Sequence, residues 1–168
     1  MVTAILRVIC NAELTCLSSA AAGAARRRKN LNIHPVLDDP VQRLFNAMEP
    51  GTYVRPHRHA RSEGWELMLA VRGAFSLLAF DEHGKVIARA DLEAGTGDAA
   101  VDIPGYVWHA AVAMAPGTVM FEVKPGPYRS LDDKDFALWA PQEGDRAAAD
   151  MVAWYETAQP GMTWPRCD

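Results

Sequence analysis

Two histidines, His57 and His59, stand two positions apart in the stretch Gly-Thr-Tyr-Val-Arg-Pro-His-Arg-His that begins at Gly51. Side chains alternate along a β-strand, so residues two apart leave the same face and both imidazoles should point the same way. The carboxylate Glu66 follows at the head of the next apolar run, Trp-Glu-Leu-Met-Leu. Two imidazoles and a carboxylate on neighbouring strands are three parts of a metal site.

A third histidine, His109, lies on a later candidate strand, where it alternates with Val107, Ala111 and Ala113. If this strand pairs into the same small barrel, His109 completes a set of three histidines and one carboxylate. Such ligands suit Zn, Fe, Mn, Ni or Cu, and the spacing does not choose between them. Four protein ligands leave open positions on a five- or six-coordinate ion, and open positions permit reactivity.

Other residues near these candidates have simpler interpretations. His34 and His83 stand alone, so we expect a hydrogen-bonded surface or core role for the first. His83 falls in a predicted turn and is expected to be solvated. Trp108 flanks His109 but points to the opposite face, which predicts a packing role.

The elements that must position these side chains are short strands. From residue 41 onwards, short apolar runs alternate with turn residues, which is typical of an all-β sandwich or barrel. The stretch Asp-Glu-His-Gly at residues 81–84 predicts a hairpin turn. The predicted strands are 42–49, 52–59, 65–72, 74–80, 85–92, 99–103, 107–114 and 118–124.

One helix is predicted on each side of the strands, in residues 2–25 and 145–157. The apolar positions at helical spacing are Ile5, Val8, Ile9, Ala12 and Cys16 in the first, and Ala147, Ala148, Met151, Val152 and Tyr155 in the second. Residues 32–40 and the stretch after residue 127 up to Pro141 are expected to be irregular. We therefore predict an N-terminal helical segment at 1–30, packed on the barrel or on a dimer partner, and a β-barrel domain with a C-terminal helix at 31–168.

Composition sets broad limits on function. The 168 residues are 49% apolar and 23% charged, as in an ordinary globular domain. The net charge is −4, which favours neither nucleic acid nor an anionic membrane as partner. The only basic run, at residues 26–29, is expected to be a solvated junction after a helix. Three scattered cysteines (Cys10, Cys16 and Cys167) argue against a disulfide framework. Without an evident signal peptide or membrane span, a cytoplasmic protein is expected.

The residues around the histidines resemble a known superfamily. Residues 51–73 resemble the first cupin signature: glycine, five residues, His-x-His, a short gap, glutamate, six residues, glycine. Residues 97–109 resemble the second, Gly-Asp followed by Pro104 and a histidine five positions later. Stretches resembling the WbuC-type cupin-fold metalloproteins are 31–40, 49–59, 121–128, Asp133-Lys134-Asp135-Phe136 and Trp139-Ala140-Pro141. The resemblance spans roughly residues 26–157 and implies a mainly β fold: a single cupin double-stranded β-helix, or jelly-roll barrel, with an N-terminal and a C-terminal helix.

By this resemblance, four residues carry over as metal ligands: His57, His59, Glu66 and His109. The gap of six residues between His59 and Glu66 is longer than usual, and Glu63 falls at the shorter spacing as a rival ligand. We favour Glu66, because it keeps the six-residue run to Gly73. Two further departures are Gly105 directly after Pro104, and Ala113 where many cupins have asparagine.

Four polar residues are candidates for catalysis. Tyr53 and Arg55 share parity with His57 and should face the barrel interior. An inward arginine needs a carboxylate or a substrate anion, and a structural pair with Glu122 is the simpler expectation. Lys124 shares parity with Glu122 and is either a base in the pocket or a salt-bridge partner.

The favoured function is a metal-dependent enzyme, isomerase-like or epimerase-like, acting on a small polar or sugar-derived molecule. The resemblance implies a link to surface-polysaccharide biosynthesis and one divalent transition metal: Fe, Mn, Zn or Ni. An Fe(II)-dependent dioxygenase and a non-catalytic cupin that binds a small molecule are the alternatives. The expected partners are that small molecule and a second copy of the chain in a homodimer, with no nucleic acid and no membrane.

Overall fold

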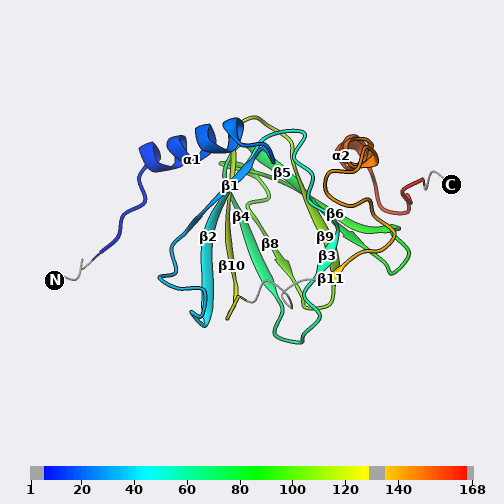
Figure 1. The fold of residues 1–168 in the computed structure, drawn as a ribbon, viewed down its shortest axis with the longest axis horizontal. Coiled ribbons are helices and arrows are strands. Elements are labelled where there is room, and N and C mark those ends of the chain that lie inside the picture. The colour runs from blue at the N-terminus through cyan, green and yellow to red at the C-terminus, as the bar shows by residue number, and fades with distance from the viewer. Residues whose placement is uncertain (1–5, 129–134, 166–168) are drawn as a thin grey trace.

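The computed structural model describes residues 6–128 and 135–165. Within these ranges the protein is mainly β, with two antiparallel sheets facing each other and one helix near either end (Figure 1). The predicted jelly-roll fold with two flanking helices is confirmed. Some predicted features lie outside the described residues: positions 2–5 of the first helix, Cys167, and Asp133 and Lys134.

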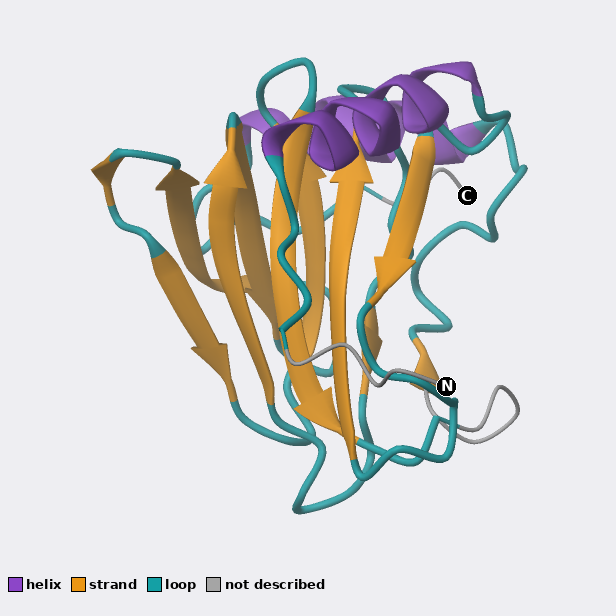
Figure 2. Ribbon diagram, turned by 90° about the vertical axis from the view of Figure 1, so that its left-hand side faces the viewer, coloured by secondary structure: helices purple, strands orange, loops and turns teal. Residues whose placement is uncertain are grey.

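The two sheets, here called sheet A and sheet B, form two layers of strands (Figure 2), and each draws its strands from distant parts of the chain. Sheet A has the order β1 (Arg28–Asn32), β2 (Val41–Met48), β10 (Thr118–Pro125), β4 (Glu66–Arg72) and β8 (Ala100–Ile103). Sheet B has the order β11 (Asp135–Phe136), β3 (His57–Arg58), β9 (Trp108–Ala113), β5 (Ala74–Phe80), β6 (Val86–Glu93) and β7 (Thr96–Gly97).

Strand alternation divides the apolar residues between the space inside the sandwich and the outer face of sheet B. Inside, the cluster includes Met48, Met68, Phe75, Leu77, Ala111 and Met120. On the outer face of sheet B, the cluster includes Leu78, Phe80, Trp108, Ala110 and Val112, and the C-terminal helix covers it. The prediction that alternate residues of the strand at 107–114, among them Ala111 and Ala113, face the interior is therefore confirmed. The predicted outward packing of Trp108 is confirmed as well.

Helix α2 (Ala147–Thr157) buries Ala148, Met151, Val152 and Tyr155, as its spacing predicts. Helix α1 (Asn11–Gly23) is shorter than predicted and uses a different face. It buries Leu14, Leu17 and Ala21 against sheet A, whereas Val8 is 75% exposed and Cys16 is exposed. The helix starts late because the Glu13 carboxylate accepts a hydrogen bond from the Cys10 amide at 3.0 Å, which caps the first turn there.

The predicted hairpin turn between β5 and β6 is confirmed. The Asp81 carboxylate accepts hydrogen bonds from the amides of His83 (2.8 Å) and Lys85 (2.9 Å). Gly84 adopts φ +86°, a left-handed conformation that favours glycine. These backbone hydrogen bonds hold the pKa of Asp81 below its usual value.

The predicted strand over 52–59 is wrong for most of its length, because only His57 and Arg58 pair as β3. Thr52 instead donates to the carbonyl of Arg27 at 2.8 Å, and the Arg28 guanidinium donates to the carbonyl of Tyr53. Side-chain bonds thus replace a strand ladder before Pro56, which has no amide hydrogen to contribute.

Three strands were not predicted: β1, β7 and β11. The basic run expected as a solvated junction leads directly into β1, which pairs with β2 at the edge of sheet A. Charged residues are common on edge strands because they discourage pairing with other chains. None of the helices in the described parts of the chain is long and apolar enough to cross a membrane.

Candidate metal centre

Four side chains converge between the two sheets, with one possible ligand atom from each lying within 4.8 Å of the others: His57, His59, Glu66 and His109. Sheet B supplies two of the histidines, since β3 pairs with β9 so that His57 lies opposite His109, and His59 directly follows β3. Glu66 is the first residue of β4 in sheet A. All four are nearly inaccessible to solvent, at 1–4% exposure.

Backbone carbonyls orient two of the imidazoles in the same way. Nδ1 of His57 lies 3.0 Å from the carbonyl oxygen of Arg55, and Nδ1 of His109 lies 2.9 Å from that of Val107. A carbonyl only accepts, so Nδ1 carries a proton in each ring, and Nε2 is the ring nitrogen left to face the cluster. Such an outer hydrogen bond is the usual way in which a protein prepares a histidine to ligate a metal.

Glu66 connects the cluster to a buried lysine. Its two oxygens lie 2.8 Å from His59 Nε2 and 3.0 Å from His109 Nε2, and Oε1 also lies 3.0 Å from Lys124 Nζ. Burial alone raises the pKa of Glu66, but the Lys124 ammonium and the bonds to both histidines hold this pKa well below its usual value. Glu66 is therefore ionised, as a metal ligand must be.

The structure places Glu66 against the histidines and Glu63 away from them. Glu63 is exposed in the loop between β3 and β4, whereas Glu66 is 1% exposed. The long gap after His59 is taken up by this loop, in which the Gly64 amide donates to the Arg61 carbonyl at 3.0 Å.

The donor set suits a metal ion. Three imidazoles and one carboxylate are intermediate ligands that bind Fe, Mn, Zn or Ni, and their atoms already face a common point. No second group of three or more His, Cys, Asp or Glu residues able to hold an ion occurs among residues 6–128 and 135–165.

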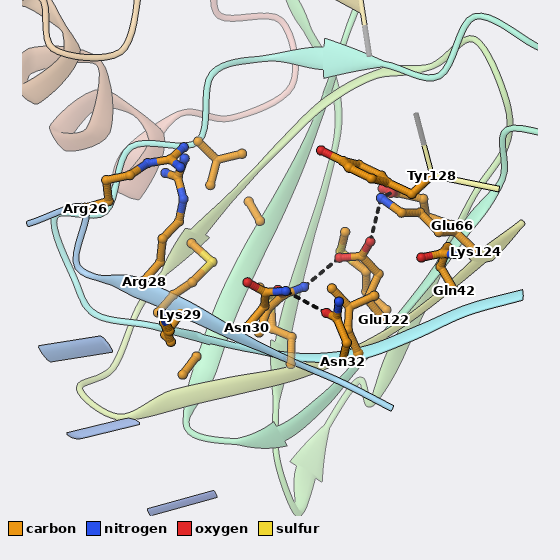
Figure 3. Close-up of a pocket in the computed structure, with 18 of the residues that line it drawn as sticks. Arg26, Arg28, Lys29, Asn30, Asn32, Gln42, Glu66, Glu122, Lys124 and Tyr128 are labelled. Carbon is orange, nitrogen blue, oxygen red and sulfur yellow. Dashed lines mark hydrogen bonds and ion pairs between the residues drawn. The ribbon is translucent and has the colours of Figure 1, made fainter. Parts of the chain in front are cut away.

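A cavity of about 670 Å³ reaches this cluster from the edge of the sandwich. Its walls include His57, Glu66 and His109. Beside them, Lys124 Nζ lies 2.9 Å from Oε1 of Glu122 (Figure 3). The Asn46 amide donates to the other oxygen of Glu122 at 2.6 Å. An ammonium and a carboxylate thus face the same space as three of the four possible ligands.

The expected inward orientation of Tyr53 is wrong. Its ring belongs to the cluster under α2, and its hydroxyl donates to the carbonyl of Pro141 at 2.8 Å. Burial raises its pKa far above the usual range, so the phenol stays protonated. Arg55 does not meet Glu122 either: it donates to the Ala137 carbonyl at 2.8 Å and lies over the ring of Phe136. Neither residue lines the cavity.

Gln42 and His34 are among the cavity-wall residues that sequence reasoning did not place there. Gln42 alternates with Asn46 and Met48 on β2, and an inward polar position on a predicted strand was the available signal. His34 lies beyond β1, and no spacing in the sequence places it there.

The two facing sheets with the His/Glu cluster between them have the architecture of the cupin jelly-roll fold. The chain belongs to the family described as "Domain of unknown function (DUF6016)", whose model matches residues 9–92, half of the chain. No curated protein sequence matches it.

Among solved structures, the chain is similar in fold to CapF, crystallised with the inhibitor 3-isopropenyl-tropolone. The identity is 19% over 68% of this chain and 32% of CapF, with a TM-score of 0.54. KdgF from Halomonas sp. matches at 20% identity over 61% of this chain and 82% of its own, with a TM-score of 0.47. A cupin superfamily protein from Desulfitobacterium hafniense DCB-2 matches at 16% identity over 65% and 86%, with a TM-score of 0.48.

Proposed function

We propose that the protein is a metal-dependent enzyme that isomerises or epimerises a small polar, sugar-derived molecule. The observation that carries this proposal is the buried pair of Lys124 and Glu122 in the wall of the cavity that also reaches the His/Glu cluster. A divalent transition ion held by His57, His59, Glu66 and His109 would supply Lewis acidity for a carbonyl or hydroxyl oxygen.

The chain's own residues supply an acid and a base. Isomerisation next to a carbonyl needs a base that removes a proton from carbon and an acid that delivers one to oxygen. Glu122 is the candidate base, oriented by the amide of Asn46 at 2.6 Å, and the Lys124 ammonium is the candidate acid. Both residues are buried at 6–7% exposure, so little bulk water competes for these protons.

The choice of substrate class rests on two supports. The resemblance to WbuC-type proteins favours a sugar-derived molecule of the kind used in surface-polysaccharide biosynthesis. The cavity volume of about 670 Å³ lies in the usual range for a small-molecule site.

Exchange with heavy water tests the chemistry without a known product. The metal-loaded protein is incubated in D₂O with a panel of keto and aldo sugars, and deuterium incorporation at carbon is followed by NMR. We expect incorporation with at least one sugar, and a decrease of about a hundredfold in Glu122→Gln, in line with the loss of a general base.

Glu156→Gln is a matched control, because Glu156 is an exposed glutamate on α2 outside the cavity wall. This variant should exchange as fast as the wild type. A wild-type protein that binds metal but exchanges no substrate proton would contradict the isomerase proposal and favour the binding protein. Oxygen consumption by an iron-loaded sample would instead favour the dioxygenase.

A further inference from the structure

We propose that the substrate is an anion, and that His34 binds its carboxylate at the end of the cavity that also holds Lys124. The inference rests on the proposed function, because it names the substrate class of the same site. It is carried by a buried hydrogen-bond donor for which the described residues provide no acceptor.

This donor is Nε2 of His34. The side chain is 6% exposed, and Nδ1 lies 3.0 Å from both the amide nitrogen and the carbonyl oxygen of Arg43. The Arg43 amide can only donate, and its carbonyl already accepts from the Ile33 amide at 2.8 Å. Nδ1 of the neutral ring is therefore the acceptor, and Nε2 carries the proton.

No described residue accepts a hydrogen bond from this Nε2 atom. A buried donor without an acceptor costs free energy, so its persistence in a cavity wall points to a ligand that accepts the bond. His34 lines the cavity, which gives such a ligand access.

The same end of the cavity holds a cation. Arg43, which binds His34, follows Gln42 on β2, and Gln42 lies opposite Lys124 on β10. Figure 3 shows Gln42, Lys124 and Glu66 grouped at one end of the cavity. Because β2 lies between β1 and β10, the Lys124 ammonium is not a direct neighbour of His34, but it adds positive charge at this end of the cavity, which favours an anion.

The charge of the cavity wall has the sign that an anion requires. Four cationic side chains line it (Arg26, Arg28, Lys29 and Lys124), against two carboxylates, Glu66 and Glu122. The whole chain carries a net charge of −4, so this local excess is not a general property of the surface. Glu143 pairs with Arg26 at 2.6 Å and with Arg28 at 3.1 Å, so one further carboxylate balances part of this positive charge.

Amide side chains favour hydroxyl groups on the same ligand. Asn30 and Asn32 lie along β1 in the cavity wall, where the Asn30 amide donates to the Asn32 oxygen at 2.7 Å. Each residue keeps further donors or acceptors that suit a polyol. The chemical class is therefore a hydroxylated carboxylate, such as a uronate or an aldonate.

A pair of matched probes tests this class. Galacturonate and galactose differ in a carboxylate, and calorimetry measures the affinity of each for the metal-loaded and the metal-free protein. We expect galacturonate to bind at least tenfold more tightly than galactose in both states. Equal affinities in the wild type would overturn the inference, whatever the variants do.

Substitution of His34 tests its role. His34→Leu should reduce the preference for galacturonate about tenfold, while His34→Gln, whose amide can still donate, should keep part of it. His83→Leu is the control, because His83 is exposed in the turn between β5 and β6. This variant should bind both sugars as tightly as the wild type does. A preference that survives in a folded His34→Leu protein would contradict the assignment.

Metal content separates this inference from the proposed function. If the protein takes up no metal but still prefers galacturonate, the proposed enzyme fails and the anion site stands. If it takes up metal and exchanges substrate protons, but binds both sugars equally, the anion site fails and the enzyme stands.

Discussion

In the candidate metal centre, single hydrogen bonds or ion pairs prepare three of the four ligands. The carbonyl of Arg55 sets the orientation of His57, the carbonyl of Val107 sets that of His109, and Lys124 keeps Glu66 ionised. These contacts come from the backbone or from a buried ammonium, so they do not depend on flexible surface side chains. A rigid, preoriented set of ligands binds a metal without first reorganising.

Asp81 provides a test of the structure away from the centre. Hydrogen bonds from the amides of Lys85 and His83 lower its pKa in the folded protein below the usual value of 3.8. At a pH above 3.8 the ionised carboxylate therefore stabilises the fold. This stabilisation is lost as the pH falls through the lower folded pKa. We therefore expect the wild type to lose more thermal stability than Asp81→Asn between pH 5 and about pH 3.

Thermal unfolding followed by circular dichroism across this pH window measures the difference. Asp98→Asn is a suitable control, because Asp98 is another exposed aspartate. Parallel melting curves for wild type and Asp81→Asn at every pH would contradict the assigned turn.

Residue spacing predicted some of these positions and missed others for physical reasons. His57, His59, Glu66 and His109 were found because strand alternation and signature spacing place them together. Tyr53 and Arg55 were misplaced because side-chain bonds from Thr52 and Arg28 interrupt the alternation before Pro56. The place of His34 in the cavity wall was missed because it depends on a backbone contact with Arg43, nine positions away.

At the scale of elements, helix α2 holds sheet B in place from outside the sandwich. Met151 and Tyr155 are fully buried between the helix and the sheet, in one cluster with Phe80 and Trp108. Because Trp108 precedes His109 on β9, this packing fixes the strand that carries a candidate ligand on its other face.

Met151→Ala should therefore lower the free energy of unfolding by about 2–5 kcal/mol, the usual cost of a large-to-small change in a core. Met114→Ala, at a methionine that is 42% exposed, is the matched control and should cost far less. Chemical denaturation measures both. A cost for Met151→Ala no greater than that for Met114→Ala would show that α2 does not pack as described.

Element prediction succeeded where the periodic signal was long. Seven of the predicted strands correspond to strands of four or more residues, and the helical spacing of 145–157 gave the correct buried face of α2. The two-residue strands β7 and β11 are too short to show alternation. The face of α1 was misassigned because capping at Cys10 leaves Val8 outside the helix.

At the scale of the whole molecule, we propose a homodimer. Helix α1 already buries Leu14, Leu17 and Ala21 on its own sheet, so the helix itself does not require a partner. Leu6 and Val8 just before it are 80% and 75% exposed, and a second chain would cover such apolar side chains. Sedimentation velocity at micromolar concentration should give a dimer, and Leu6→Asp with Val8→Asp should shift it toward monomer. A monomeric wild type would contradict this proposal.

The central claim, that His57, His59, Glu66 and His109 hold a divalent metal, is tested most directly by elemental analysis. The protein is purified without chelator and without nickel resin, and its metal content is measured by inductively coupled plasma mass spectrometry. We predict about one transition-metal ion per chain in the wild type, and a loss of about tenfold or more in folded His57→Ala and His109→Ala, with His83→Ala unchanged. A wild type without metal, or variants that keep it, would contradict the account.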